Sequence, residues 1–425
     1  MKRLIALLVC ILCVLGSLMA CGGEMPAGTS PSDTTPADSN PDTSPDDTTP
    51  DDTTPPEIVE DIPVTNKADI MKMKDGAKGV ISFVLDDGFF DTVDFLNGEL
   101  EKNNLRATIG MIATRVISTE GVKNEANIQR WQSYLDTGRF DIACHSYTHK
   151  FWGITDKAET GTYLKQGTTT VLEYSTKDGN ITFETQGARD ALRDCFPGQR
   201  VLAFIKPGFG QYIDENGKKQ SISPEGLELV KKYFIGMRVG GKQTQTWSVP
   251  DYYNLASYQV GKAQSLTDWT SQVDAAVKYG KWLTFMFHEV VPDSQIDKAG
   301  KTLPVRQSTT SDLMAYVGDK VANGELWCAF YEEALLYAQE QRVTSGTVKT
   351  YSERIEVSLT HKLDAETFNY PLTVRVKVPA EWTSVVLTHA DGTTETLTPF
   401  VEKDVTYVYA NVVPDGQVAV LRNAE

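Results

Sequence analysis

The chain has 425 residues, of which 40% are hydrophobic and 23% charged, and its formal net charge is −16. This composition is that of an ordinary soluble protein, and the length allows two or three domains. We find no basic stripe of the kind that binds nucleic acid, so nucleic acid is not expected as a partner.

The first twenty residues have the features of an export signal. Lys2 and Arg3 are followed by an apolar run from Leu4 to Leu18, which is shorter than the ~20 residues that a membrane span needs. The sequence Leu18-Met19-Ala20-Cys21 resembles a bacterial lipobox, although an ordinary signal peptide is the alternative. Residues 1–20 are therefore predicted to be a lipoprotein signal peptide. We expect membrane lipid to be attached through an acylated Cys21, with the protein outside the cytoplasm at a bacterial membrane or cell surface.

Residues 21–62 have the composition of a disordered linker. Asp-Thr-Thr-Pro occurs three times, starting at Asp33, Asp47 and Asp52. Eleven acidic residues and no Lys or Arg lie within residues 22–62, so this segment carries most of the net charge. Such a chain has too few apolar residues to form a core and is expected to stay extended.

Residues 63–342 alternate between strand-like and helix-like patterns, which predicts parallel strands with crossover helices. The number of such units favours a closed α/β barrel over two separate domains. Buried-strand patterns lie at 79–85, 107–113, 140–144, 201–205, 233–239, 253–260 and 283–287. Helical patterns lie at 92–103, 127–135, 224–232, 266–279, 312–321 and 331–341. Residues 171–174 and 181–184, separated by Asp178-Gly179-Asn180, predict an inserted hairpin.

Residues 343–425 change to alternating polar and apolar residues with turn signals between the runs. Strands are expected at 354–359, 372–378, 385–388, 394–397, 405–410 and 417–421. This pattern predicts a small all-β domain of the sandwich type.

Three of the five histidines in the chain, His145, His149 and His288, lie where predicted strands of the barrel end. Asp86 and Asp87 follow the first strand in the same way. In barrels of parallel strands, active sites form at this edge. The other two histidines, His361 and His389, are expected at the surface.

These residue types match the needs of metal-dependent hydrolysis. One carboxylate and two imidazoles can hold Zn²⁺ or a similar ion with open positions, where bound water becomes acidic. A second carboxylate can take the proton of that water, and a further histidine can protonate a leaving group.

The motifs resemble those of the polysaccharide deacetylase family, also called the NodB-homology or carbohydrate esterase family 4 domain. Leu85-Asp86-Asp87-Gly88 matches the first motif, His145 to His149 the second, and Phe285-Met286-Phe287-His288 the fifth. The resemblance implies a distorted (β/α) barrel over residues 63–342. It also implies Asp86 as general base, His288 as general acid, and Asp87, His145 and His149 as metal ligands.

Two further motifs match imperfectly. Lys206-Pro207-Gly208-Phe209-Gly210 stands where the family has Arg-x-Pro-x-Gly, and the resemblance implies supporting roles for Lys206, Pro207, Phe209 and Gly210. Lys206 is a possible partner of Asp86. In the fourth motif Asp268 and Trp269 match, but Ser265 replaces the acid that orients the acid histidine in the family.

The function expected from this resemblance is deacetylation of an extracellular polysaccharide, with an N-acetyl amino-sugar polymer favoured. O-deacetylation of a xylan-type polymer and non-catalytic glycan binding by a surface lipoprotein are the alternatives. Zn²⁺ is the expected cofactor, with Co²⁺ or Ni²⁺ also suited to the ligands, and a monomer is expected.

Overall fold

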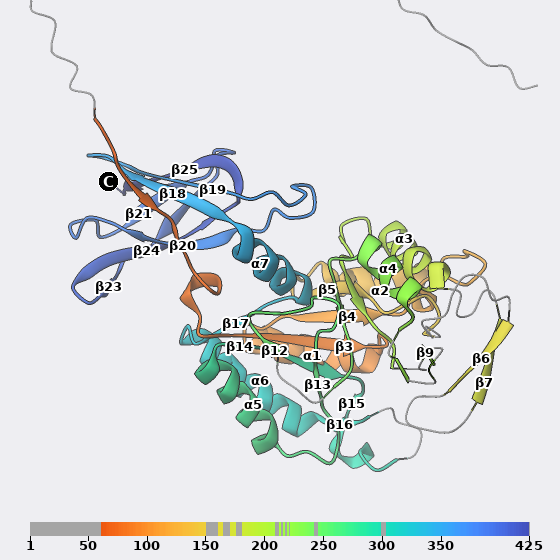
Figure 1. The fold of residues 1–425 in the computed structure, drawn as a ribbon. Coiled ribbons are helices and arrows are strands. Elements are labelled where there is room, and N and C mark those ends of the chain that lie inside the picture. The colour runs from red at the N-terminus through yellow and green to blue at the C-terminus, as the bar shows by residue number, and fades with distance from the viewer. Residues whose placement is uncertain are drawn as a thin grey trace, which may run out of the picture. The chain divides into compact units, whose positions relative to one another are not determined.

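The computed structural model describes residues 61–149, 160–164, 171–175, 181–208, 212–213, 216, 219–220, 222–241, 245–298 and 303–424. Two bodies of secondary structure follow one another within these ranges, a mixed α/β part and an antiparallel β part (Figure 1). The expected signal peptide, linker and Cys21 lie outside the described residues, as do Phe209 and Gly210.

The α/β part is built on a largely parallel sheet with β3 at its centre. All eight residues of β3 are buried, because strands of a parallel sheet are covered on both faces. Parallel partners flank it, with β4 on one side and β14 on the other. The strands of this sheet are β3 (Gly79–Asp86), β4 (Ala107–Met111), β5 (Phe140–Cys144), β8 (Ala203–Ile205), β11 (Gly236–Arg238), β12 (Gln245–Thr246), β13 (Tyr258–Gln259), β14 (Lys281–Phe287) and β17 (Leu326–Cys328).

The segment after β11 closes this sheet into a distorted barrel. Leu255 forms a parallel bridge with Arg238 of β11, and three residues later β13 pairs with β14. Starting from β3, each strand pairs with the next in the order β4, β5, β8 and β11. The segment 255–259 then connects β11 to β14, which pairs with β3 again. The expected distorted (β/α) barrel is confirmed.

Helices pack on this barrel through apolar stripes. In α5, buried Trp269, Val273 and Ala276 recur at helical spacing, which places one face of the helix on the sheet. The helices are α1 (Phe90–Lys102), α2 (Glu125–Leu135), α3 (Ala188–Cys195), α4 (Pro224–Tyr233), α5 (Leu266–Tyr279), α6 (Gln307–Ala322) and α7 (Tyr331–Val343). Single turns are η1 (Lys74–Gly76), η2 (Ala113–Arg115), η3 (Phe183–Gly187) and η4 (Asp293–Gln295).

The inserted hairpin differs from its prediction. β7 (Val171–Ser175) forms as expected, but its antiparallel partner is β6 (Thr160–Leu164). Residues 181–184 were expected to be that partner, and they are helical instead. Tertiary contacts override the β-branched composition there, because the Phe183 ring stacks on Tyr147 and Glu184 is fully buried. Two more short pairs are β9 (Tyr212–Ile213) with β10 (Lys219–Gln220), and β15 (Val290–Val291) with β16 (Val305–Arg306).

The expected β-sandwich at the C-terminal end is confirmed, and it recruits the start of the described chain. One sheet has the order β1-β18-β19-β25-β21-β22 and the other β2-β20-β24-β23. Residues 64–70, assigned to the barrel from the sequence, supply β1 and β2. The strands are β1 (Val64–Lys67), β2 (Asp69–Ile70), β18 (Ser345–Thr350), β19 (Ile355–Thr360), β20 (Leu372–Lys377), β21 (Val385–Thr388), β22 (Thr394–Leu397), β23 (Phe400–Glu402), β24 (Val405–Val412) and β25 (Asp415–Asn423).

Helix α7 shares one buried cluster with barrel and sandwich residues. Its Tyr337 Oη donates to the carbonyl of Met71 at 3.0 Å, and its Glu340 accepts from the backbone N–H of Tyr370. The His361 side chain is only 2% exposed and lies 3.9 Å from Glu340, so its expected surface position is wrong. A fully buried Glu340 is one of the few charged side chains of the core.

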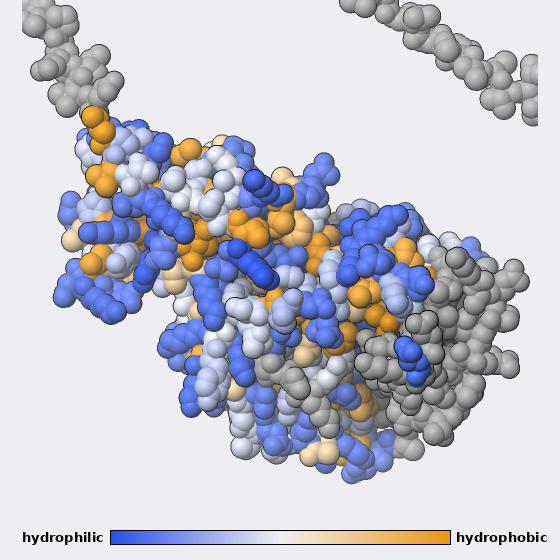
Figure 2. All heavy atoms as spheres, in the orientation of Figure 1, coloured by the Kyte–Doolittle hydropathy of each residue, from blue (hydrophilic) through white to orange (hydrophobic). Residues whose placement is uncertain are grey.

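Hydrophilic residues cover much of the face drawn in Figure 2, with hydrophobic residues scattered among them. Within the described ranges, no helix combines the length and apolarity that crossing a bilayer requires.

Candidate metal centre and active site

Strand ends bring the predicted chemical residues to one edge of the barrel. Asp86 is the last residue of β3, and Asp87 follows it. His145 follows β5, and His288 follows β14. Because these strands run parallel, their carboxyl ends meet at the same edge.

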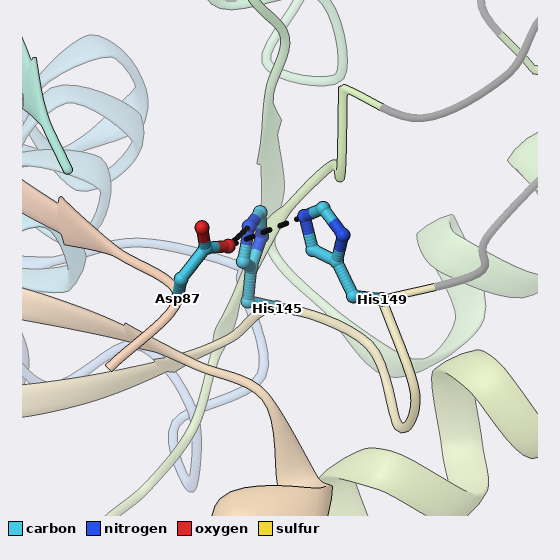
Figure 3. A group of neighbouring side chains, drawn as sticks. All are labelled: Asp87, His145 and His149. Atoms are coloured by element: carbon cyan, nitrogen blue, oxygen red, sulfur yellow. Dashed lines mark ion pairs between the residues drawn. The ribbon is translucent and has the colours of Figure 1, made fainter. Parts of the chain in front are cut away.

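Asp87, His145 and His149 form a compact cluster (Figure 3). Asp87 Oδ1 lies 3.3 Å from His145 Nε2 and 3.2 Å from His149 Nε2. One ligand atom from each residue fits within 4.8 Å of the others. Among the described residues this is the group of three His, Cys, Asp or Glu side chains with metal-site spacing.

The donor atoms of this cluster fit a divalent cation. His145 Nδ1 is 2.6 Å from the carbonyl oxygen of Ile205, which only accepts, so Nδ1 carries the proton and Nε2 keeps its lone pair. That lone pair faces the Asp87 carboxylate, and neither Asp87 Oδ1 nor His145 Nε2 has a hydrogen-bond partner in the part of the chain described. A divalent cation held by the three side chains would satisfy both of these buried acceptors. Two imidazoles and a carboxylate are a ligand set that suits Zn²⁺.

The protonation states favour metal binding. Burial, followed by the nearby charge of His145, lowers the pKa of His149 to about 4, so its ring is neutral at pH 7. Burial raises the pKa of Asp87, but its closeness to His145, and then to His149 and His288, lowers that pKa by more. Asp87 is therefore ionised, as a ligand must be.

The loop that carries the histidines is held in an uncommon conformation. Ser146 and His149 have positive φ angles of 64° and 65°. Glu184 fixes this loop, because its Oε2 accepts from the backbone N–H groups of Tyr147 and Thr148, each at 2.9 Å. Its other oxygen accepts from Thr148 Oγ1 at 2.5 Å. Sequence reasoning missed Glu184, which was placed in the expected hairpin.

The Asp87 turn is held in a similar way. Asp87 has a φ of 72° and is followed by Gly88 at 65°. Arg115 donates from Nε to the carbonyl of Asp87 at 2.8 Å. Left-handed backbone at a non-glycine residue costs energy and persists where the surroundings impose it, often at functional sites.

Asp86 is paired with an arginine that sequence reasoning did not single out. Arg238, the last residue of β11, donates from Nη2 to Asp86 Oδ2 at 2.7 Å, and both side chains are buried. The partner considered from the sequence, Lys206, instead donates to the carbonyl of Pro207 at 3.0 Å. Burial and the charge of Arg238 lower the pKa of Lys206 to about 8. The available signal for Arg238 was its position as a charged residue within the apolar strand predicted at 233–239.

His288 lies on the other side of Asp86. Its Nε2 is 3.9 Å from Asp86 Oδ2, and its backbone carbonyl accepts from Thr92 Oγ1 at 3.1 Å. Burial lowers the pKa of His288, although Asp86 and Asp87 oppose the shift. Its buried Nδ1 has no hydrogen-bond partner within the described ranges. This matches the sequence, in which Ser265 replaces the orienting acid.

The remaining matched residues lie apart from this cluster. Asp268 and Ser265 form a capping box at the start of α5, and the Asp268 carboxylate accepts from the Ser265 backbone at 2.7 Å. Trp269 is 1% exposed and packs edge-on against Phe287. Cys144, next to His145, is fully buried, and burial raises the pKa of its thiol.

No family model matches the chain. A gellan lyase from Bacillus sp is 28% identical over 377 residues, which are 84% of this chain and 13% of that protein. The chain therefore spans only about an eighth of the length of this relative.

Several solved structures are similar to the chain, at low sequence identity and low TM-score. They include the Xyl-CE4 domain of a multidomain xylanase from the hindgut metagenome of Trinervitermes trinervoides (15% identity, 60% of this chain, 89% of that one, TM-score 0.35). The Bc1960 peptidoglycan N-acetylglucosamine deacetylase also matches (11%, 63% and 90%, TM-score 0.36). So does BA3943, a CE4 family pseudoenzyme from Bacillus anthracis (11%, 61% and 66%, TM-score 0.35). Identities and TM-scores this low assign no activity, which must be argued from the residues of the site.

Proposed function

We propose that this protein is a metal-dependent hydrolase that removes acetyl groups from a polysaccharide, with N-acetyl groups on an amino-sugar polymer favoured. The observation that carries the proposal is the Asp87, His145 and His149 cluster, which stands beside a second carboxylate and a third histidine at one barrel edge. The matching sequence motifs support the same assignment.

Asp87, His145 and His149 would hold the ion, for which Zn²⁺ is our first choice. When bound, such an ion lowers the pKa of water and polarises an acetyl carbonyl. His145 is oriented for this task by Ile205, and His149 by the loop that Glu184 holds.

Asp86 is the proposed general base. Arg238 neutralises and orients one carboxylate oxygen, while the other, Oδ1, has no hydrogen-bond partner in the described part of the chain. The side chain lies between His145 and His288, at 4.0 Å and 3.9 Å. It is therefore placed to take a proton from a water molecule that attacks an acetyl carbon.

His288 is the proposed general acid. Burial lowers the pKa of His288, so its ring is neutral before the reaction begins. We propose that Asp86, 3.9 Å away, passes the proton taken from water to His288, which then donates it to the leaving group. An amine leaves an amide only when its nitrogen is protonated, and His288 meets that requirement. This need is weaker for an ester, which is why the N-acetyl substrate is favoured.

Acetate release tests the proposal. The purified protein is incubated with chitooligosaccharides and with acetylated xylan, with and without a chelator, and then with added Zn²⁺. We expect acetate from the amino-sugar substrate, loss with chelator and recovery with metal. Release from xylan alone would favour the O-acetyl alternative. Glycan binding without any acetate release would favour the non-catalytic alternative.

Anchoring through Cys21 remains a proposal as well, since residues 1–60 lie outside the described part. A Cys21→Ala variant expressed in its host is expected to leave the membrane fraction. Retention of that variant in the membrane would contradict the lipid anchor.

A further inference from the structure

A groove of about 630 Å³ opens on one side of the C-terminal sandwich, and we call it the β1–β20 groove. It is lined by β1, β20, the end of β18 and the start of β24. The chain crosses here from one sheet to the other, because β1 ends at Lys67 and β2 begins at Asp69. Edges of both sheets therefore lie along the groove.

Main-chain groups are open along these edges. β1 is the last strand of its sheet and pairs only with β18, so one edge of Val64–Lys67 has no strand partner in the described part of the chain. In the other sheet, β2 pairs with β20 at Val374 and Arg375, and Lys377 lies beyond this pairing. An open strand edge is a template for another extended chain, since its N–H and C=O groups need partners.

The two faces of β1 differ in polarity. Asn66 is paired opposite Val348, which is buried between the sheets, and Val64 shares that inner face because alternate residues of a strand do. Val64 is nevertheless 64% exposed, so apolar surface is open to water at the groove. Lys67 lies on the opposite face. A strand added beside β1 would therefore meet an apolar surface on one face and a positive charge on the other.

The free charges of the groove are positive. Asp69, its one acidic lining residue, already pairs with Arg375 at 2.8 Å. Lys67 and Lys377 are exposed lining residues, and within the described ranges no side-chain hydrogen bond or ion pair holds either ammonium group. The chain as a whole carries a net charge of −16, so the groove is a basic patch on an acidic protein. Such a patch attracts acidic groups.

We propose that the β1–β20 groove binds an extended peptide of another protein, in which apolar and acidic side chains alternate. The peptide main chain adds a strand to β1, its apolar side chains cover Val64, and its carboxylates pair with Lys67 and Lys377. This interaction goes beyond the proposed function and does not depend on acetate release.

Other occupants fit the groove less well. A second copy of this chain, related by a two-fold axis, would place one positive groove against another and bring two acidic proteins together, and like charges repel. An anionic glycan can pair with Lys67 and Lys377, but it offers no strand to the open main-chain edge of β1. A peptide meets the main-chain, apolar and charge requirements together.

Titration calorimetry of the full chain with synthetic peptides is the first test. We expect a peptide of alternating valine and aspartate to bind, and to bind more weakly as salt is added. Lysine in place of aspartate should abolish binding. N-methylation of alternate amides removes main-chain hydrogen bonds and should raise the dissociation constant at least about tenfold. No binding of the aspartate peptide, or equal binding of its N-methylated form, would overturn the proposal.

Variants of the two lysines locate the binding site. Lys67→Gln/Lys377→Gln should raise the dissociation constant of the aspartate peptide at least about fivefold, because two ion pairs are lost. Lys362→Gln/Lys403→Gln changes the charge equally at exposed lysines of the sandwich outside the groove, and it should bind as the wild type does. Circular dichroism and thermal melting establish that both variants are folded.

Two outcomes would contradict the assigned site or occupant. Equal affinity in the groove variant and the control variant would place the peptide elsewhere. An oligomer of uronic acid that binds the groove as tightly as the aspartate peptide would identify an anionic glycan as the occupant. Neither outcome bears on the acetate assay, so this proposal and the proposed function can fail separately.

Discussion

Arg238 and Asp86 form a buried ion pair that joins β11 to β3 across the barrel edge, with 2.7 Å between Nη2 and Oδ2. The two side chains are 1% and 3% exposed. Burying one charge of such a pair without the other is costly, because the remaining charge has lost its water and has no partner. The pair therefore gives the proposed base a partner of opposite charge in the core of the barrel.

Replacing Arg238 should destabilise the folded protein. Arg238→Met leaves Asp86 buried without its partner, and we expect a loss of about 3–5 kcal/mol in the free energy of unfolding. Asp86→Asn/Arg238→Met removes both charges and should recover much of that loss. Urea denaturation of the wild type, both single variants and the double variant measures the coupling. If the loss in free energy of unfolding in the double variant equals the sum of the losses in the two single variants, the two side chains do not depend on each other.

The loop anchored by Glu184 should control metal affinity. Glu184→Gln can no longer accept all three hydrogen bonds from residues 147 and 148, so His149 is less firmly placed. We expect metal affinity to fall about 10–100-fold, as for other partners that orient metal ligands. Competition titration with a chromophoric chelator measures the affinity.

Asp190→Asn, on the exposed part of α3, is the matched control and should bind metal as the wild type does. If Glu184→Gln binds metal as tightly as this control, the loop does not depend on Glu184.

Glu340 should make stability depend on pH. Burial raises the pKa of Glu340 from 4.5 to about 8 in the folded protein. Between these values the unfolded chain releases the proton while the folded chain keeps it. The folded state then binds more protons, so stability falls as pH rises from about 4.5 to 8 and levels off above.

Urea denaturation at pH 5, 6.5 and 8 measures this slope. We expect Glu340→Gln, which stays neutral and can still accept from Tyr370, to flatten it. Exposed Glu353→Gln should leave it as in the wild type. A slope that is the same in the Glu340 variant would assign the pH dependence to other groups.

Much of the fold follows from local patterns in the sequence. The run at Gly79–Asp86 is apolar throughout and becomes the fully buried central strand, and the period-2 runs after residue 354 become the sandwich strands. The segment at 64–70 gives no such local signal of its partners, which lie about 300 residues away in the sequence. Its place in the sandwich depends on long-range pairing.

In the site, too, the residues in local motifs were predicted from the sequence, and those that act across long sequence separations were not. Strand ends place Asp86, Asp87, His145 and His288 together, and those residues were visible in the sequence as motifs. Arg238 and Glu184 were missed because each acts on a residue far along the chain. The His361 side chain is buried against Glu340 of α7 and not against a sequence neighbour.

Metal content shows whether Asp87, His145 and His149 hold an ion. The wild-type protein, His145→Ala and Asp86→Asn are each loaded with Zn²⁺, passed through a desalting column and analysed for bound metal and acetate release. We predict one ion per chain in the wild type, loss of the ion in His145→Ala, and retention of the ion with loss of turnover in Asp86→Asn. A His145→Ala variant that keeps the ion would contradict the assigned metal site.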